Sequence, residues 1–151
     1  MKKYIICFLL EFLICFSIVY AKDNYISVSY IEQSEELRFI DFVQISVASN
    51  TDMELQIQIQ KSLLPFSHVI EKKVIAYKQD NKYEFTFIDS FGNKAYGYIK
   101  VISPEVIEFF LDCKKFSDEG KDLARLYGDV YLLTKNENPI DPEIFISILR
   151  D

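Results

Sequence analysis

The chain has 151 residues, of which 17 are basic and 23 are acidic, giving a net charge of −6. Half of its residues are hydrophobic and 15% are aromatic, which is enough apolar material to build a core. The acidic balance argues against a nucleic-acid partner, whose phosphates require clustered Lys and Arg, and against docking on an anionic lipid surface.

Residues 1–21 have the pattern of a secretory signal peptide. Lys2 and Lys3 give a positive start, positions 4–19 form an almost unbroken apolar run, and position 21 is a small residue at the expected cleavage site. An uncleaved anchor is the alternative, but the run is slightly short and contains Glu11, which is costly in hydrocarbon. We therefore expect cleavage after Ala21 and export to a periplasm or to the cell exterior. Contact with a membrane is then limited to the signal sequence before cleavage.

Removal of the signal leaves a single exported β-rich domain, residues 22–151. Two lysines and one glutamate leave with residues 1–21, so 15 basic residues face 22 acidic ones and the charge becomes −7. Two of the three cysteines leave as well, so Cys113 stands alone and cannot form a disulfide within the domain. The domain must therefore be held together by its core.

Almost every segment of this domain alternates with a period of two, which is typical of half-buried strands. The clearest case is residues 53–61, where Leu55, Ile57 and Ile59 share one face and glutamate and glutamines share the other. The expected inward residues include Phe39, Val43, Ile57, Phe85, Phe87, Phe109 and Leu111. In chain order we expect strands at 25–32, 37–47, 53–61, 69–77, 83–89, 95–101, 106–115 and 129–135.

A Gly92-Asn93 pair separates two runs of aromatic and β-branched residues. A phosphate-binding loop would need more glycines and a following helix, so we interpret the pair as the tip of a hairpin. A loop of residues 92–94 places Phe85 opposite Val101 and separates apolar from polar side chains best. Gly97 then leaves room for a bulky ring from across the sheet.

Helices are credible in two places. Residues 117–127 fit a helical turn and a loop equally well, because Gly120 interrupts a weak period. Residues 141–150 begin with Asp141 at the N-cap and Pro142 at the first helical position, which favours a short helix over an open edge or mouth of the sheet. The fold class is therefore mainly β: about eight antiparallel strands in a meander, forming a small barrel or strongly bent sheet with a short C-terminal helix. The alternative is an α+β fold with a second helix at 117–127.

No pattern of catalytic or metal-ligating residues emerges. His68 is the only histidine, which excludes a two-histidine metal site, and no G-x-S-x-G motif is present. Cys113 is in phase with apolar residues, so we expect it to be buried and inert. The acids around residues 117–129 lack the order of a calcium loop, and a glycosidase cleft would be unusual without tryptophan. We expect no cofactor, no metal and no catalytic residue.

The best candidate for a surface that contacts a partner lies near residues 124–133. Alternation there predicts that Leu126, Val130 and Leu132 point inward and that the intervening residues point outward. Tyr and Arg are enriched at interface hot spots. An internal pairing of Arg125 with an acid, with tyrosines covering the barrel wall, is the alternative. The candidate partner surface comprises Tyr96, Tyr98, Arg125, Tyr127, Asp129 and Tyr131.

Three functions remain open. The first is a non-enzymatic binding or inhibitor-like module for another exported protein. The second is a carrier of a small apolar ligand, which resembles the lipocalins in architecture only, because their G-x-W strand is missing. The third is a small hydrolase, whose only support is His68 and a set of unplaced acids.

Overall fold

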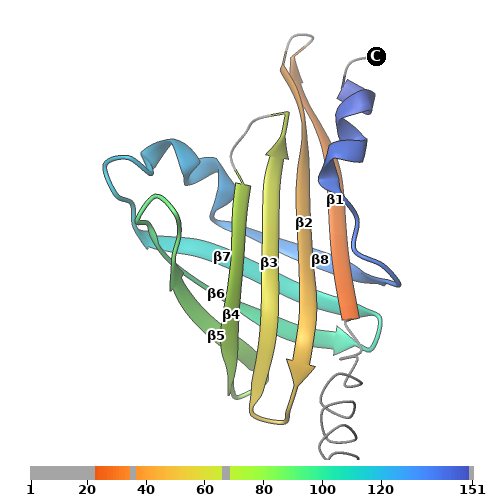
Figure 1. The fold of residues 1–151 in the computed structure, drawn as a ribbon, viewed down its shortest axis with the longest axis vertical. Helices are drawn as coiled ribbons and strands as arrows, with labels where there is room; N and C mark the ends of the chain where they lie inside the picture. Colours follow the sequence, from red (N-terminus) through yellow and green to blue (C-terminus); the bar gives the residue numbers. More distant parts are fainter. Residues whose placement is uncertain (1–22, 35–36, 66–68, 150–151) are drawn as a thin grey trace, which may run out of the picture.

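The computed structural model describes residues 23–34, 37–65 and 69–149; the expected signal peptide and His68 lie outside these ranges. Eight antiparallel strands follow one another around a closed barrel, which confirms the predicted fold class (Figure 1). The strands are β1 (Asp23–Ser34), β2 (Leu37–Asn50), β3 (Glu54–Leu64), β4 (Val69–Gln79), β5 (Lys82–Ile88), β6 (Lys94–Ser103), β7 (Val106–Lys115) and β8 (Asp129–Asn136).

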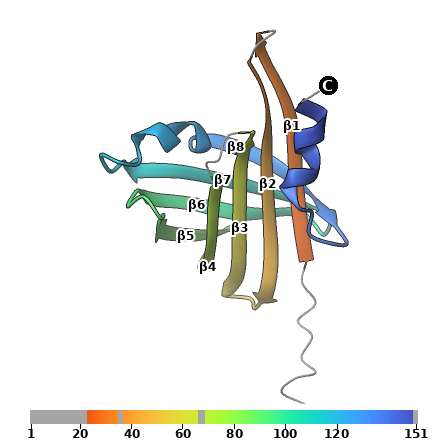
Figure 2. The same cartoon turned by 45° about the horizontal axis from the view of Figure 1, so that its top comes forward.

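The barrel consists of two four-stranded halves that are joined by short stretches of pairing. β4 pairs with β5 only through residues 77–79 and 82–84, and β1 pairs with β8 only through residues 24–26 and 134–136. In both views the strands β5–β8 cross the direction of β1–β4 (Figures 1 and 2). The two halves therefore face each other like the layers of a sandwich, with the core between them.

The core is built from the residues that alternation predicts to point inward. All seven expected inward residues are buried, from Phe39 on β2 to Leu111 on β7. The ring centroids of Phe85 lie 6.3 Å from Phe87 and 6.1 Å from Phe109, and Phe109 lies 6.4 Å from Tyr131. These aromatic rings occupy the space between the two halves of the barrel.

The β5–β6 hairpin has the predicted faces but not the predicted register. Phe85 lies opposite Gly97, not opposite Val101, because the turn comprises residues 89–93 rather than 92–94. Asp89 fixes this longer turn by accepting hydrogen bonds from the backbone N–H groups of Phe91 and Asn93, each at 2.9 Å. The prediction for Gly97 is confirmed, since a Cβ there would lie 2.7 Å from the ring of Phe85.

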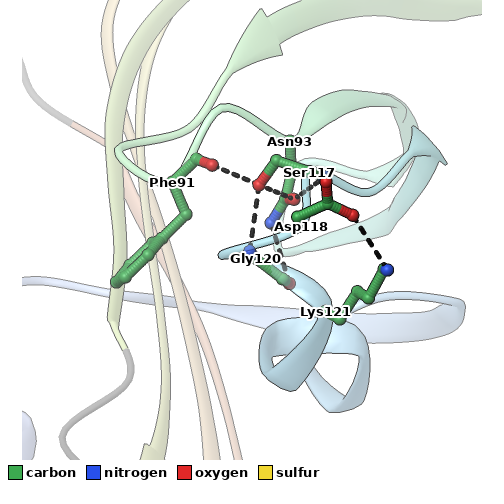
Figure 3. Close-up of polar contacts among 6 residues, drawn as sticks. All are labelled: Phe91, Asn93, Ser117, Asp118, Gly120 and Lys121. Atoms are coloured by element: carbon green, nitrogen blue, oxygen red, sulfur yellow. Dashed lines mark hydrogen bonds and ion pairs between the residues drawn. The ribbon is translucent and has the colours of Figure 1, made fainter.

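Residues 117–127 contain a short 3-10 helix, η1 (Lys121–Leu126), which resolves the choice between helix and loop. Leu123 and Leu126 belong to the buried core, so η1 covers the interior of the barrel. The preceding loop is tied to the β5–β6 turn: Ser117 N–H donates to Asn93 Oδ1 at 2.8 Å, and Asn93 Nδ2 donates to the Gly120 carbonyl at 3.2 Å (Figure 3).

The C-terminal helix is present but lies in a different place from the one expected. It is a 3-10 helix, η2 (Pro142–Leu149), and Asp141 caps it by accepting a hydrogen bond from Glu143 N–H at 3.0 Å. It packs on the outer face of β2 and β3, not over an edge or mouth of the sheet. The helix packs there because this position buries apolar surface: the outward ring of Phe42 is fully buried and lies 6.0 Å from the ring of Phe145.

Candidate functional site

The structure separates the six residues of the candidate partner surface. Tyr96 and Tyr98 lie on the outer face of β6, and Arg125 and Asp129 are exposed. Tyr127 and Tyr131 are buried in the core, only 7% and 9% exposed, so the expectation that they face outward is wrong. Gly128, with a φ of 97°, interrupts the extended chain between them.

The strand after Gly128 therefore shows the opposite face to the one predicted. Val130 and Leu132 are 56% and 63% exposed, whereas Tyr131 and Leu133 are buried. Tyr131 is drawn inward because its hydroxyl donates to Asp41 Oδ2 at 2.7 Å inside the barrel. The two apolar residues that alternation assigns to the core thus lie on the outer surface, on the same half of the barrel as Tyr96 and Tyr98.

These outward residues, of which Val130 and Leu132 are exposed and the aromatic ones half-buried, form one surface on the half of the barrel made of β5–β8. Tyr98 lies directly opposite Phe110 on β7, and Phe110 lies directly opposite Val130 on β8. Side chains directly opposite on one face of a sheet are in contact. We call the surface formed by Tyr96, Tyr98, Phe110, Val130 and Leu132 the outer wall.

The aromatic residues of the outer wall are held in fixed orientations. The ring of Phe110 lies 5.9 Å from that of Tyr96 and 5.4 Å from that of Tyr98. Tyr96 Oη donates to Asp112 at 3.0 Å, and Tyr98 Oη donates to Glu108 at 3.0 Å. The bond to Asp112 raises the pKa of Tyr96, and burial together with the bond to Glu108 raises the pKa of Tyr98. The two phenols therefore remain neutral hydrogen-bonding groups.

A groove of about 430 Å³ adjoins the outer wall where β4 and β5 separate. Its apolar lining includes Ile75, Tyr77 and Phe110, and two of its residues are Lys82 and Lys114. The ammonium group of Lys82 lies 4.8 Å from the ring centroid of Tyr98, and that of Lys114 lies 5.2 Å from that of Tyr96. Glu84 also lines the groove and pairs with Lys82 at 2.7 Å, so the groove combines aromatic faces with charged groups of both signs.

A second unusual site lies inside the barrel around Lys61, which is fully buried. Its Nζ donates to Tyr131 Oη at 2.5 Å and lies 4.4 Å from the centroid of that ring. Burial lowers the pKa of Lys61, which the nearby carboxylates of Asp41 and Asp129 only partly offset. Burial and the bond to Asp41 raise the pKa of Tyr131. Because Lys61 has no exposed surface, it is not available as a nucleophile to a molecule outside the barrel.

Sequence reasoning did not select this cluster, although the signal was present. Lys61 continues the inward phase of Ile57 and Ile59, and Asp41 continues that of Phe39 and Val43. When a charged residue occupies a position on the inward face of a strand, between apolar residues, the sequence indicates that the charged group is buried.

A third polar cluster, at the β5–β6 turn, serves the fold. Asn93 is fully buried, and its Nδ2 donates to Asp89 Oδ2 at 2.8 Å. Tyr127 Oη donates to the same oxygen at 2.7 Å. Burial alone would raise the pKa of Asp89, but the hydrogen bonds from Tyr127, Asn93 and Phe91 outweigh it and lower that pKa. The carboxylate is thus occupied by donors of its own chain.

The lone thiol and the acidic side chains give no further site. Cys113 faces inward but is half-buried rather than buried as expected, and burial raises the pKa of its thiol. Across residues 23–34, 37–65 and 69–149, no three His, Cys, Asp or Glu side chains gather as a metal site would require. Within the same ranges, neither helix is long enough to span a bilayer.

Comparison with known proteins gives no relative. A scan against protein-family models found no matching family, and searches of the curated proteins and of the solved structures found no match.

Proposed function

We propose that this protein is an exported, non-enzymatic binding module, inhibitor-like in character, which engages another exported protein through its outer wall. The observation that carries the proposal is the row of Tyr98, Phe110 and Val130 across three strands, in which two half-buried rings lead to the exposed Val130. Ordered aromatic residues on an open apolar surface are typical of protein–protein contacts. The signal-like N-terminus supports export.

The packing of the interior weighs against a carrier of a small apolar ligand. A drug-sized ligand requires an enclosed space of several hundred Å³. The stacked rings of Phe85, Phe87, Phe109 and Tyr131 lie where such a ligand would sit. We do not propose a hydrolase, because its main support, His68, lies outside the described residues.

A pull-down with matched variants tests the proposal. The tagged domain of residues 22–151 is incubated with an extract of exported proteins, in parallel with Val130→Asp and Leu132→Asp. We expect a discrete protein to be retained by the unchanged domain and lost with both variants, because each places a charge in the outer wall. Met53→Asp is the control, since Met53 is 66% exposed in the β2–β3 turn and is not part of the outer wall. Retention that is equal for all four proteins, or no retention, would refute the proposal.

A further inference from the structure

The edge of β4 that faces β5 is largely unpaired. β4 pairs with β3 from Val69 to Tyr77 without a break in register. On its other side, the described strands offer β4 no partner except at residues 77–79. A free strand edge presents backbone N–H and C=O groups that can accept another strand.

The register shows which backbone groups point to this open edge. Lys78 N–H donates to the Met53 carbonyl of β3 at 2.8 Å. Because backbone groups alternate in direction along an antiparallel strand, the even-numbered residues of β4 bond to β3 and the odd-numbered ones point the other way. Glu71, Lys73 and Ile75 therefore direct both backbone groups to the open edge.

Side-chain exposure shows that this edge is accessible. The outward residues Val69 and Ile75 are 40% and 43% exposed. The inward residues Lys72 and Val74 are only half-buried, although Ile70 and Ala76 on the same face are buried. The half-buried pair therefore lies where the core is open between β4 and β5.

Charge decides which kind of strand fits. Glu84 pairs with Lys82 at 2.7 Å, whereas Glu71 accepts only from the neutral amide of Gln58 at 3.0 Å and keeps its charge. Two lysines and one carboxylate therefore lie along residues 71–73. In the part of the chain that the structure describes, neither Lys72 nor Lys73 has a carboxylate partner. A second copy of β4 would bring two further lysines and one glutamate to this edge. The lysines oppose self-pairing in most registers, and sedimentation without peptide tests the one register in which Glu71 faces Lys73 of the copy. A segment that carries carboxylates would instead be attracted.

We propose that β4 binds an extended acidic segment of the partner as an additional strand. The backbone of the segment bonds to Glu71, Lys73 and Ile75, and its carboxylates face Lys72 and Lys73. Its apolar side chains enter the groove beside Ile75 and Tyr77, which leads to the outer wall. This inference rests on the proposed function and specifies the chemistry of the partner.

The test uses a defined probe, the blocked peptide Thr-Ile-Val-Glu-Asp-Val-Thr, titrated into the ¹⁵N-labelled domain of residues 22–151. In the antiparallel alignment, its Glu faces Lys73 and its Asp faces Lys72. We expect saturable amide shifts concentrated at residues 71, 73 and 75. A peptide with lysine in place of both acids should bind about tenfold more weakly.

Two variants at one position separate backbone from charge. Lys73→Pro removes an N–H that β3 does not use, and an edge strand tolerates proline there, so we expect at least about tenfold weaker binding with the β3–β4 amides unchanged. Lys73→Gln removes only the charge and should weaken binding by about threefold.

Other outcomes would overturn the proposal. These are an absence of shifts at millimolar peptide, equal affinity for both peptides, equal effects of the two variants, or a dimer through β4 in sedimentation without peptide. If the peptide fails while capture still depends on Val130 and Leu132, the proposed function stands without strand addition. If the peptide binds but that capture fails, β4 is a strand acceptor and the outer wall is not the binding surface.

Discussion

The two halves of the barrel differ in how far the aromatic residues on their outer faces are buried. Both carry outward aromatic residues: Phe42 on β2 and Phe110 on β7. Phe42 is fully buried, with its ring 6.0 Å from Phe145 of the C-terminal helix η2, whereas Phe110 lies in a row that ends at the exposed Val130. The chain buries the outer face around Phe42 and leaves Val130 and Leu132 open to solvent, and exposed apolar patches are typical of interaction sites, which is why the outer wall is the candidate surface.

The largest expected difference between the two faces is in stability. Phe42→Ala removes a fully buried ring and should lower the free energy of unfolding by about 3–5 kcal/mol. Phe110→Ala removes a half-buried ring and should cost about 1 kcal/mol. Urea denaturation of the two variants measures both values. Similar losses of stability would mean that Phe42 and Phe110 contribute equally to the fold, which would contradict the difference between the two faces.

A smaller effect should follow from loosening η2. Gln44 Oε1 accepts a hydrogen bond from Ile140 N–H at 2.7 Å, just before the helix begins. Gln44→Ala leaves that N–H without its partner and should cost about 1–2 kcal/mol, because buried donors are expensive to leave unbonded. Hydrogen exchange should show faster exchange in η2 and no change in β6 and β7. Faster exchange throughout the barrel would show that η2 is not a separate cover.

The smallest expected effect is the pH dependence of stability caused by Lys61, which is buried inside the barrel. Its pKa is lowered in the folded state, so the unfolded chain binds more protons as the pH approaches the ordinary value for lysine. Stability should therefore rise with pH above the folded pKa and up to about pH 10. Above that, Tyr127 and Tyr131 oppose the rise because their pKa values are raised. Lys61→Met should abolish the rise, which urea titrations at several pH values would show; an unchanged slope would contradict the assignment.

Local alternation was sufficient to predict the strands and the inward residues of β2, β3, β5 and β7. It failed at β8, where the orientation of Tyr131 is set by Asp41, 90 positions away, and by Lys61, 70 positions away. The alternation within residues 129–135 contains no information about these distant partners. On that pattern alone, a tyrosine is expected on the outer surface and a valine in the core.

Register and helix position were also beyond the local pattern. The β5–β6 register depends on the side chain of Asp89, which binds two backbone N–H groups and lengthens the turn. The place of η2 depends on Phe42, an outward residue whose burial requires a cover from the far end of the chain. The place of η2 thus depends on a tertiary contact, whereas the register depends on a local side-chain contact of Asp89 that the alternation of apolar residues does not show.

Site-specific photo-crosslinking tests the central claim most directly. A benzophenone amino acid is placed either at Val130 on the outer wall or at Val28, which is 41% exposed on β1 of the other half. The account predicts that Val130 crosslinks to one discrete protein in an extract of exported proteins and that Val28 does not. Equal crosslinking from both positions, or none from Val130, would contradict it.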